Sequence, residues 1–109
     1  MHYHILYHSY DARDRESAKK WVDLTAEKFG GIDVLVNNAG DIFGFEDFLD
    51  LDETAWTETF QLNVQVPFFL AQRTFALIKK TSGWKIINIS SIAAKYVGSS
   101  RSLHYGASK

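Results

Sequence analysis

Apolar residues recur at helical spacing between Asp14 and Phe29, every three or four positions. This spacing places them on one face of a helix that packs against a core. Asp14 stands where the N-cap of this helix is expected. Aspartate favours that position because its carboxylate can accept hydrogen bonds from the free N–H groups of the first turn. Gly30 and Gly31 follow, and a glycine in the left-handed conformation commonly ends a helix. The pattern predicts a structural helix over 14–29.

A second helical pattern begins after Asp52, which is the expected N-cap, and continues to about Lys80. Its apolar positions recur at three or four residues and are Phe60, Val64, Phe68, Ala71, Phe75 and Ile78. Pro67 interrupts the pattern, and because proline has no N–H, the carbonyl of Asn63 loses its helical partner. We expect a long helix over 53–80, kinked near Pro67, with enough apolar surface for a partner subunit.

Two short, continuous apolar runs lie between and after these helices, over 32–36 and 84–89. Such runs are typical of strands that are buried on both faces of a parallel sheet. Residues 3–9 are aromatic and β-branched, which predicts a further strand. Strands that alternate with helices in this way indicate an α/β fold.

Composition narrows the class of protein. The chain has 109 residues, a net charge of −1 and no cysteine, so a single domain is expected, without a disulfide framework, a thiolate metal site or a basic surface for nucleic acid. No apolar run approaches the ~18 residues that a membrane span requires, and no signal-peptide pattern opens the chain. A cytoplasmic enzyme part is the expected class.

Three histidines near the start, His2, His4 and His8, have even offsets and would share one side of a strand. A metal site is conceivable, but no carboxylate joins them at close spacing. We interpret them as solvent-facing histidines on an edge strand and expect no metal.

The end of the chain carries the strongest chemical signal. Tyr105 precedes Lys109 by four residues, so a helix places both side chains on one face, one turn apart. A tyrosine titrates near ~10 and needs a nearby cation to act as a base at neutral pH. Ser91 follows the apolar run at 84–89 and could supply a hydroxyl to a substrate oxygen. Alone, a tyrosine and a lysine at this spacing are more often a helix-surface pair than a catalytic pair.

Further motifs occur in a fixed order with this pair: Asn37-Asn38-Ala39-Gly40, then Asn63, then Asn88-Ile89-Ser90-Ser91. Together they resemble the short-chain dehydrogenase/reductase family, and in detail its ketoacyl-reductase-like members, over essentially the whole chain. The resemblance implies part of a Rossmann-type, doubly wound parallel sheet. It also implies NAD or NADP as the coenzyme and a hydride transfer that interconverts a small-molecule alcohol and a ketone.

The resemblance assigns catalytic roles to four residues. Tyr105 passes a proton to or from the substrate oxygen. Lys109 lowers the pKa of the tyrosine and bonds the nicotinamide ribose. Ser91 orients the carbonyl, although Ser90 stays an alternative, because the interval to Tyr105 is one residue longer than usual in the family. Asn63 holds a water of the proton relay.

Coenzyme contacts follow by the same resemblance. Asn38, Ala39 and Gly40 are expected against the adenosine ribose, and Tyr105 and Lys109 near the nicotinamide half. Asp11 is expected to bond the adenine amino group, although a turn or capping aspartate explains it equally well. The helix at 53–80 matches one that makes a dimer interface, so a homo-oligomer is expected.

The family's glycine-rich phosphate turn has no counterpart among the seven glycines of the chain. By the resemblance we therefore expect residues 1–109 to be a single incomplete domain that lacks the N-terminal glycine-rich unit and the C-terminal substrate region. The strand at 3–9 is expected to be displaced, swapped or poorly ordered for lack of its neighbour. The alternative is that the chain is a truncated, non-catalytic remnant of the family and acts as an interaction module.

Overall fold

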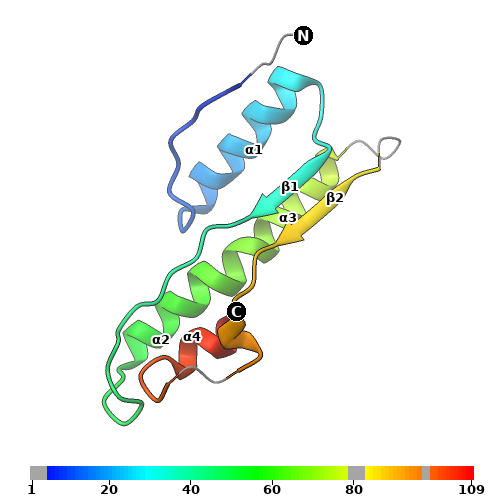
Figure 1. Ribbon diagram of the computed structural model, residues 1–109. Coiled ribbons are helices and arrows are strands. Elements are labelled where there is room, and N and C mark those ends of the chain that lie inside the picture. Colours follow the sequence, from blue (N-terminus) through cyan, green and yellow to red (C-terminus); the bar gives the residue numbers. More distant parts are fainter. Residues whose placement is uncertain (1–4, 79–82, 97–98) are drawn as a thin grey trace.

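The computed structural model describes residues 5–78, 83–96 and 99–109 (Figure 1). Its elements, in chain order, are α1 (Arg15–Phe29), β1 (Val34–Asn37), α2 (Glu53–Phe60), the π-helix η1 (Gln61–Gln65), α3 (Val66–Leu77), β2 (Lys85–Asn88), the 3₁₀ helix η2 (Ile92–Ala94) and α4 (Leu103–Ser108). β1 and β2 pair in parallel, with Val34 opposite Lys85 and Asn37 opposite Asn88. The α/β class with a parallel sheet is confirmed.

The first helix, α1, begins and ends where the sequence predicts. Asp14 is the N-cap, and its carboxylate accepts hydrogen bonds from the backbone N–H groups of Glu16 and Ser17. Gly30 ends the helix at φ 77°, in the left-handed region that glycine adopts without steric cost. Both signals are local, so they were readable from the sequence.

The expected long helix is present over residues 53–77, in three segments, and it ends before Ile78, whose backbone is extended. Asp52 caps α2 by accepting from the N–H of Ala55. In η1 the backbone widens to a π turn, and the N–H of Val66 donates to the carbonyl of Gln61. Pro67, the second residue of α3, follows directly. A π turn beside a proline is a known cause of helix irregularity. Residues 79–82 lie outside the described residues.

α1 and α3 pack together over one face of the sheet. Their buried residues form the core with β1, through Ala18 and Val22 of α1, Leu70 of α3, and Ile32 and Leu35 of the strand region. Ile32 also bridges to Ile78 at the end of the long helix. The core therefore lies between the two helices and one side of the strand pair (Figure 1).

The expectation that the strands are buried on both faces is wrong for the described residues. Leu35 is 5% exposed, whereas Val34 and Val36 are 46% and 50% exposed. Ile87 of β2 is also exposed. Side chains alternate along a strand, and the two helices cover only the Leu35 side. The apolar run thus reflects a second apolar face, which no described element covers.

The expected strand over 3–9 is not formed by residues 5–9, which have no strand pairing. Residues 3 and 4 lie outside the described residues. An isolated strand gains no ladder hydrogen bonds, so without a neighbour the segment stays irregular. It instead leads to Tyr10, whose ring stacks on Trp21 of α1 with 4.6 Å between the ring centroids.

The molecule is elongated, with extents of 51 × 26 × 25 Å and a radius of gyration of 16.3 Å. A compact domain of this length has a radius of about 13 Å. In Figure 1, α1 and the sheet occupy one end, and α2 and α4 the other. Within the described part of the chain, no helix combines the length and apolarity needed to cross a bilayer.

Candidate functional site

Two asparagines stand opposite each other where the parallel strands end. Asn37 is buried, and its Nδ2 donates to Oδ1 of Asn88 at 2.9 Å and to the carbonyl of Pro67 at 3.4 Å. These contacts tie the carboxyl ends of β1 and β2 to the start of α3. This edge of an open α/β sheet is where ligands commonly bind.

Asn63, in the π turn η1, is buried and joins two other segments. Its Oδ1 accepts from the N–H of Asp41 at 3.0 Å, and its Nδ2 donates to the carbonyl of Asp41 at 2.8 Å. Nδ2 also donates to Oγ of Ser108 at 2.9 Å. The loop after β1 and the last turn of α4 are thus held by one side chain.

Lys109 brings its ammonium group to the same place. Its backbone N–H donates to the carbonyl of Tyr105 at 3.0 Å, so the two residues lie one helical turn apart, as expected. A Cβ atom built on Gly40 would lie 2.8 Å from Nζ of Lys109 and 3.1 Å from Oδ1 of Asn63. The ammonium therefore lies against the backbone of Gly40, and only a residue without a side chain allows this approach.

Ser90 and Ser91 have different surroundings. Oγ of Ser90 donates to the carbonyl of Lys109 at 3.0 Å. Oγ of Ser91 accepts from the N–H of Ala93 at 3.2 Å and so caps η2. η2 packs closely on α4, because a Cβ on Gly106 would lie only 2.7 Å from the carbonyl oxygen of Ala93.

A groove of about 370 Å³ opens at this edge of the sheet; we call it the Lys109 groove. It is lined by Asn37, Ala39, Asn63, Val64, Pro67, Phe68, Ala71, Asn88, Ile89, Ser90, Ser108 and Lys109. The structure thus brings together Asn63, Lys109 and the segment around Gly40. Ser91, Tyr105 and Asp11 are not among the lining residues.

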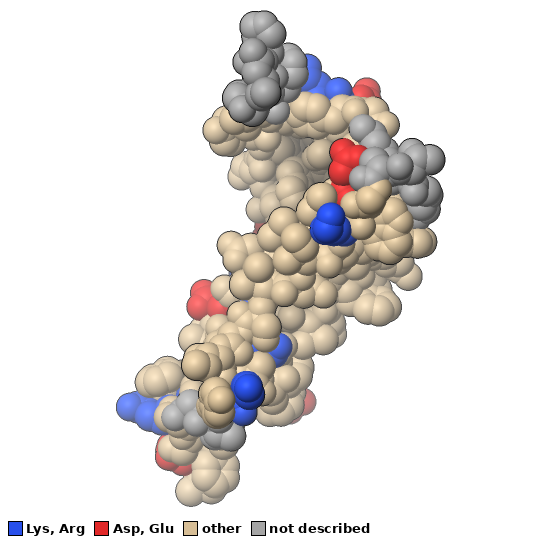
Figure 2. All heavy atoms as spheres, turned by 45° about the vertical axis from the view of Figure 1, so that its right-hand side comes forward, with Lys and Arg blue, Asp and Glu red and all other residues tan. Residues whose placement is uncertain are grey.

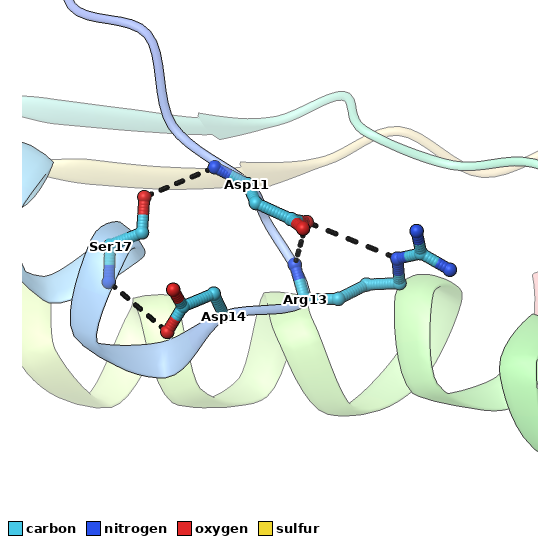
Figure 3. A network of polar contacts seen from close by, with 4 residues as sticks. All are labelled: Asp11, Arg13, Asp14 and Ser17. Atoms are coloured by element: carbon cyan, nitrogen blue, oxygen red, sulfur yellow. Dashed lines mark hydrogen bonds and ion pairs between the residues drawn. The ribbon is translucent and has the colours of Figure 1, made fainter.

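Asp11 lies in a turn before α1 (Figure 3). Its Oδ1 accepts from the N–H of Arg13 at 3.0 Å, and its own N–H donates to Oγ of Ser17 at 3.1 Å. These are the contacts of a turn aspartate. The guanidinium group of Arg13 lies 5.5 Å from the ring centroid of Phe43, which places this turn beside the loop after β1.

Sequence reasoning missed three buried polar residues of this region: Thr59, His104 and Ser108. Asn37 belongs to the motif at 37–40 that carries the family resemblance, and its position at a strand end, matched by Asn88, was a usable signal. The three missed residues sit within helices, and each has a partner 16 to 61 residues away in sequence. No local pattern marks such contacts.

Other kinds of site have less support. Among the described residues, no three His, Cys, Asp or Glu side chains gather closely enough to hold a metal ion. His2 and His4 lie outside the described residues. Figure 2 shows one face of the molecule, on which basic and acidic side chains are mixed and a broad area between them carries few charges.

Comparisons with known proteins show what this chain is similar to. L-rhamnose 1-dehydrogenase (NAD(P)(+)) of Azotobacter vinelandii is 39% identical over 100 residues, which are 91% of this chain and 38% of that protein. L-rhamnose-1-dehydrogenase of Scheffersomyces stipitis is 38% identical over 95 residues, 86% of this chain and 36% of that protein. A short chain dehydrogenase of Burkholderia cenocepacia J2315, solved in complex with NADP, superposes with a TM-score of 0.83 at 31% identity, covering 93% of this chain and 40% of that one.

The chain thus spans somewhat over a third of the length of the curated relatives it matches. The sequence pattern described as short chain dehydrogenase matches residues 2–109, which is nearly the whole chain. The chain therefore belongs to the short chain dehydrogenase family.

Proposed function

We propose that this chain carries part of the active site of an NAD(P)-dependent oxidoreductase that interconverts an alcohol and a carbonyl. The observation that carries the proposal is the position of the Lys109 ammonium group, against Gly40 and Asn63 at the carboxyl ends of two parallel strands. The coenzyme, when bound, supplies or accepts the hydride.

The residues of the chain have distinct roles in this proposal. Tyr105 passes a proton between its phenol oxygen and the substrate oxygen. Lys109 holds the coenzyme ribose with its ammonium group. Ser91 orients the substrate carbonyl and stabilises charge on its oxygen, with Ser90 as the alternative. Asn63 keeps a water in the relay that replaces the proton.

The described residues fit one part of such a coenzyme. Lys109 and Ala39 line the Lys109 groove, and Asn38 and Gly40, on either side of Ala39, are exposed. The ammonium and the peptide groups of these residues are donors and acceptors of the kind that ribose hydroxyls need. Asp11 is a further proposed contact, for the adenine amino group. The chain has no glycine-rich turn for a pyrophosphate. We therefore propose that residues 1–109 represent the central part of a larger coenzyme-binding domain.

A small-molecule alcohol or ketone is the proposed substrate, and a second copy of the chain is the proposed partner. Support for the partner comes from large apolar side chains on the long helix: Trp56, Val64, Phe68 and Phe75 are between 43% and 62% exposed. Phe68→Glu should lower any self-association seen by sedimentation, because it charges that surface. A cytoplasmic location and the absence of nucleic acid stay predictions.

A second candidate function is a non-catalytic interaction module. It is favoured by the same exposed apolar surface and by the uncovered face of the sheet, where Val34, Val36 and Ile87 are 40% or more exposed. The two candidates differ in whether the Lys109 groove binds a coenzyme.

The test is a titration of this polypeptide with NADH and NADPH, followed by fluorescence and by heat. Micromolar binding that Lys109→Met weakens, while Lys95→Met does not, would support the oxidoreductase proposal. Turnover is then assayed with a panel of sugars and secondary alcohols led by L-rhamnose. Tyr105→Phe should abolish turnover and Tyr96→Phe, which alters an exposed tyrosine, should not. Absence of binding at millimolar coenzyme would reject the proposal for this chain and leave the interaction module.

A further inference from the structure

The peptide groups around Phe43, in the loop after β1, are held by two buried side chains from different helices. Oγ1 of Thr59, on α2, accepts from the N–H of Phe43 at 3.0 Å. Nε2 of His104, on α4, lies 2.9 Å from the carbonyl oxygen of Phe43. Thr59 is 0% exposed and His104 2% exposed. Both backbone polar groups of Phe43 are thus satisfied by side chains away from solvent.

The chemistry of these contacts fixes the role of each atom. A carbonyl oxygen only accepts, so the hydrogen of the His104 contact is on Nε2. The hydroxyl of Thr59 accepts from Phe43, and its own proton has the carbonyl of Ala55 at 2.8 Å as the nearer acceptor. Each side chain therefore makes a bond to Phe43 that an apolar residue of similar shape would not make.

These contacts repeat one turn further along both helices. Asn63 lies four residues after Thr59, and Ser108 four residues after His104; Asn63 bonds both Ser108 and the peptide groups of Asp41. The loop after β1 is thus held at Phe43 and at Asp41 by the same pair of helices. Tyr105 and Lys109 directly follow His104 and Ser108 on α4.

We propose that Thr59 and His104 are positioning residues, which set the register of α4 against the loop after β1. They act through Phe43, and the result is that the Lys109 ammonium lies against Gly40. The functional part of this inference rests on the coenzyme site proposed above. The structural part, that one peptide group couples two helices, stands on the contacts alone.

The test compares paired substitutions in the full 109-residue chain. Thr59→Val and His104→Leu remove the polar atoms at similar size, whereas Thr59→Ser and His104→Gln keep an acceptor and an N–H donor. Thr25→Val is the matched control, because it removes a hydroxyl that bonds the carbonyl of Trp21 on α1, outside the site. For each variant, amide hydrogen exchange is measured at Asp41, Phe43 and Lys109, together with the dissociation constant for NADH.

Thr59→Val and His104→Leu should each raise amide exchange at Phe43 and Lys109 by about tenfold, and raise the NADH dissociation constant by a similar factor. Exchange in α1 should stay unchanged. Thr59→Ser and His104→Gln should keep amide exchange and the NADH dissociation constant close to those of the unmodified chain, because they retain the acceptor and the N–H donor. The double variant should change exchange by less than the product of the single effects, because both residues act on one peptide group.

Unchanged exchange at Phe43 in both apolar variants would overturn the inference. So would faster exchange at Phe43 without any change at Lys109 or in NADH binding. If the unmodified chain binds no NADH, the proposed function fails, and the exchange at Phe43 and Lys109 then decides the positioning role by itself.

Discussion

The side chain of Asn63 reaches Ser108 across 45 residues of sequence, with Nδ2 2.9 Å from Oγ. The hydroxyl of Ser108 in turn donates a hydrogen bond to the carbonyl of Tyr105 at 2.8 Å. A π turn in the long helix is thereby linked to the turn of α4 that carries Tyr105 and Lys109. The family motif residues Asn63 and Lys109 both lie beside Gly40, where an added Cβ atom would meet Oδ1 of Asn63 and Nζ of Lys109.

Asn63→Leu should destabilise the chain, because it leaves the N–H and carbonyl of Asp41 and the hydroxyl of Ser108 without this partner. The expected loss in the free energy of unfolding is about 1–3 kcal/mol. Urea denaturation followed by circular dichroism measures it. Gln65→Leu, at an exposed position of the same π turn, is the control and should change stability little. Equal effects of the two variants would contradict the role given to Asn63.

Gly40→Ala should weaken coenzyme binding with little effect on stability. The added Cβ would lie 2.8 Å from Nζ of Lys109, which is the end of a flexible side chain that can move aside. It would also lie 3.1 Å from Oδ1 of Asn63, which has to give by only a few tenths of an ångström. Movement of the ammonium removes the proposed ribose contact. We expect the NADH dissociation constant to rise about tenfold or more while the urea midpoint stays close to that of the unmodified chain. A large fall in the midpoint with unchanged affinity would refute this reasoning.

Gly106→Ala, in contrast, should lower the stability of the chain. Here the added Cβ would lie 2.7 Å from the backbone carbonyl oxygen of Ala93, which cannot move without shifting η2. Overpacking of this kind costs about 1–3 kcal/mol. Thermal unfolding should show the loss, and Ala107→Ser, at the adjacent exposed position, provides the baseline. An unaffected melting temperature in Gly106→Ala would mean that η2 and α4 are not packed as described.

The contribution of Tyr10 to stability should change with pH only in the alkaline range. Burial raises the pKa of Tyr10 above its ordinary value of 10.0, because the phenolate is poorly solvated beside Trp21. Below pH 10 the phenol is protonated in both the folded and unfolded chain, so its contribution is constant. As the pH rises above 10, the unfolded chain releases this proton first, and the free energy of unfolding falls.

This dependence is measured by comparing Tyr10→Phe with the unmodified chain in urea, from about pH 8 to about pH 11. The difference in stability between the two should be flat at first and then shift in favour of the phenylalanine variant. Tyr7→Phe changes a tyrosine that is 86% exposed and should give no such shift. A constant difference for Tyr10→Phe across the range would contradict the assignment.

Local patterns determined much of this fold. The cap at Asp14, the stop at Gly30 and the cap at Asp52 each depend on residues within a few positions of each other, and the structure has them where the sequence predicts. The Tyr105 and Lys109 pair one helical turn apart is local in the same sense. The family followed from motifs that are likewise short.

Tertiary structure alone decided which strand face is covered and which polar residues meet. The runs at 32–36 and 84–89 are apolar throughout, so no pattern within them tells that Leu35 is buried and Val36 is half exposed. That difference depends on where α1 and α3 pack.

The contacts of the site also depend on distant packing. Thr59, His104 and Asn63 find their partners across 16, 61 and 22 residues. Sequence determined the helices and the residues that can bond, because these depend on neighbours along the chain. Only the packing of the elements decided which of those residues bond, because hydrogen bonds and burial depend on distance in space.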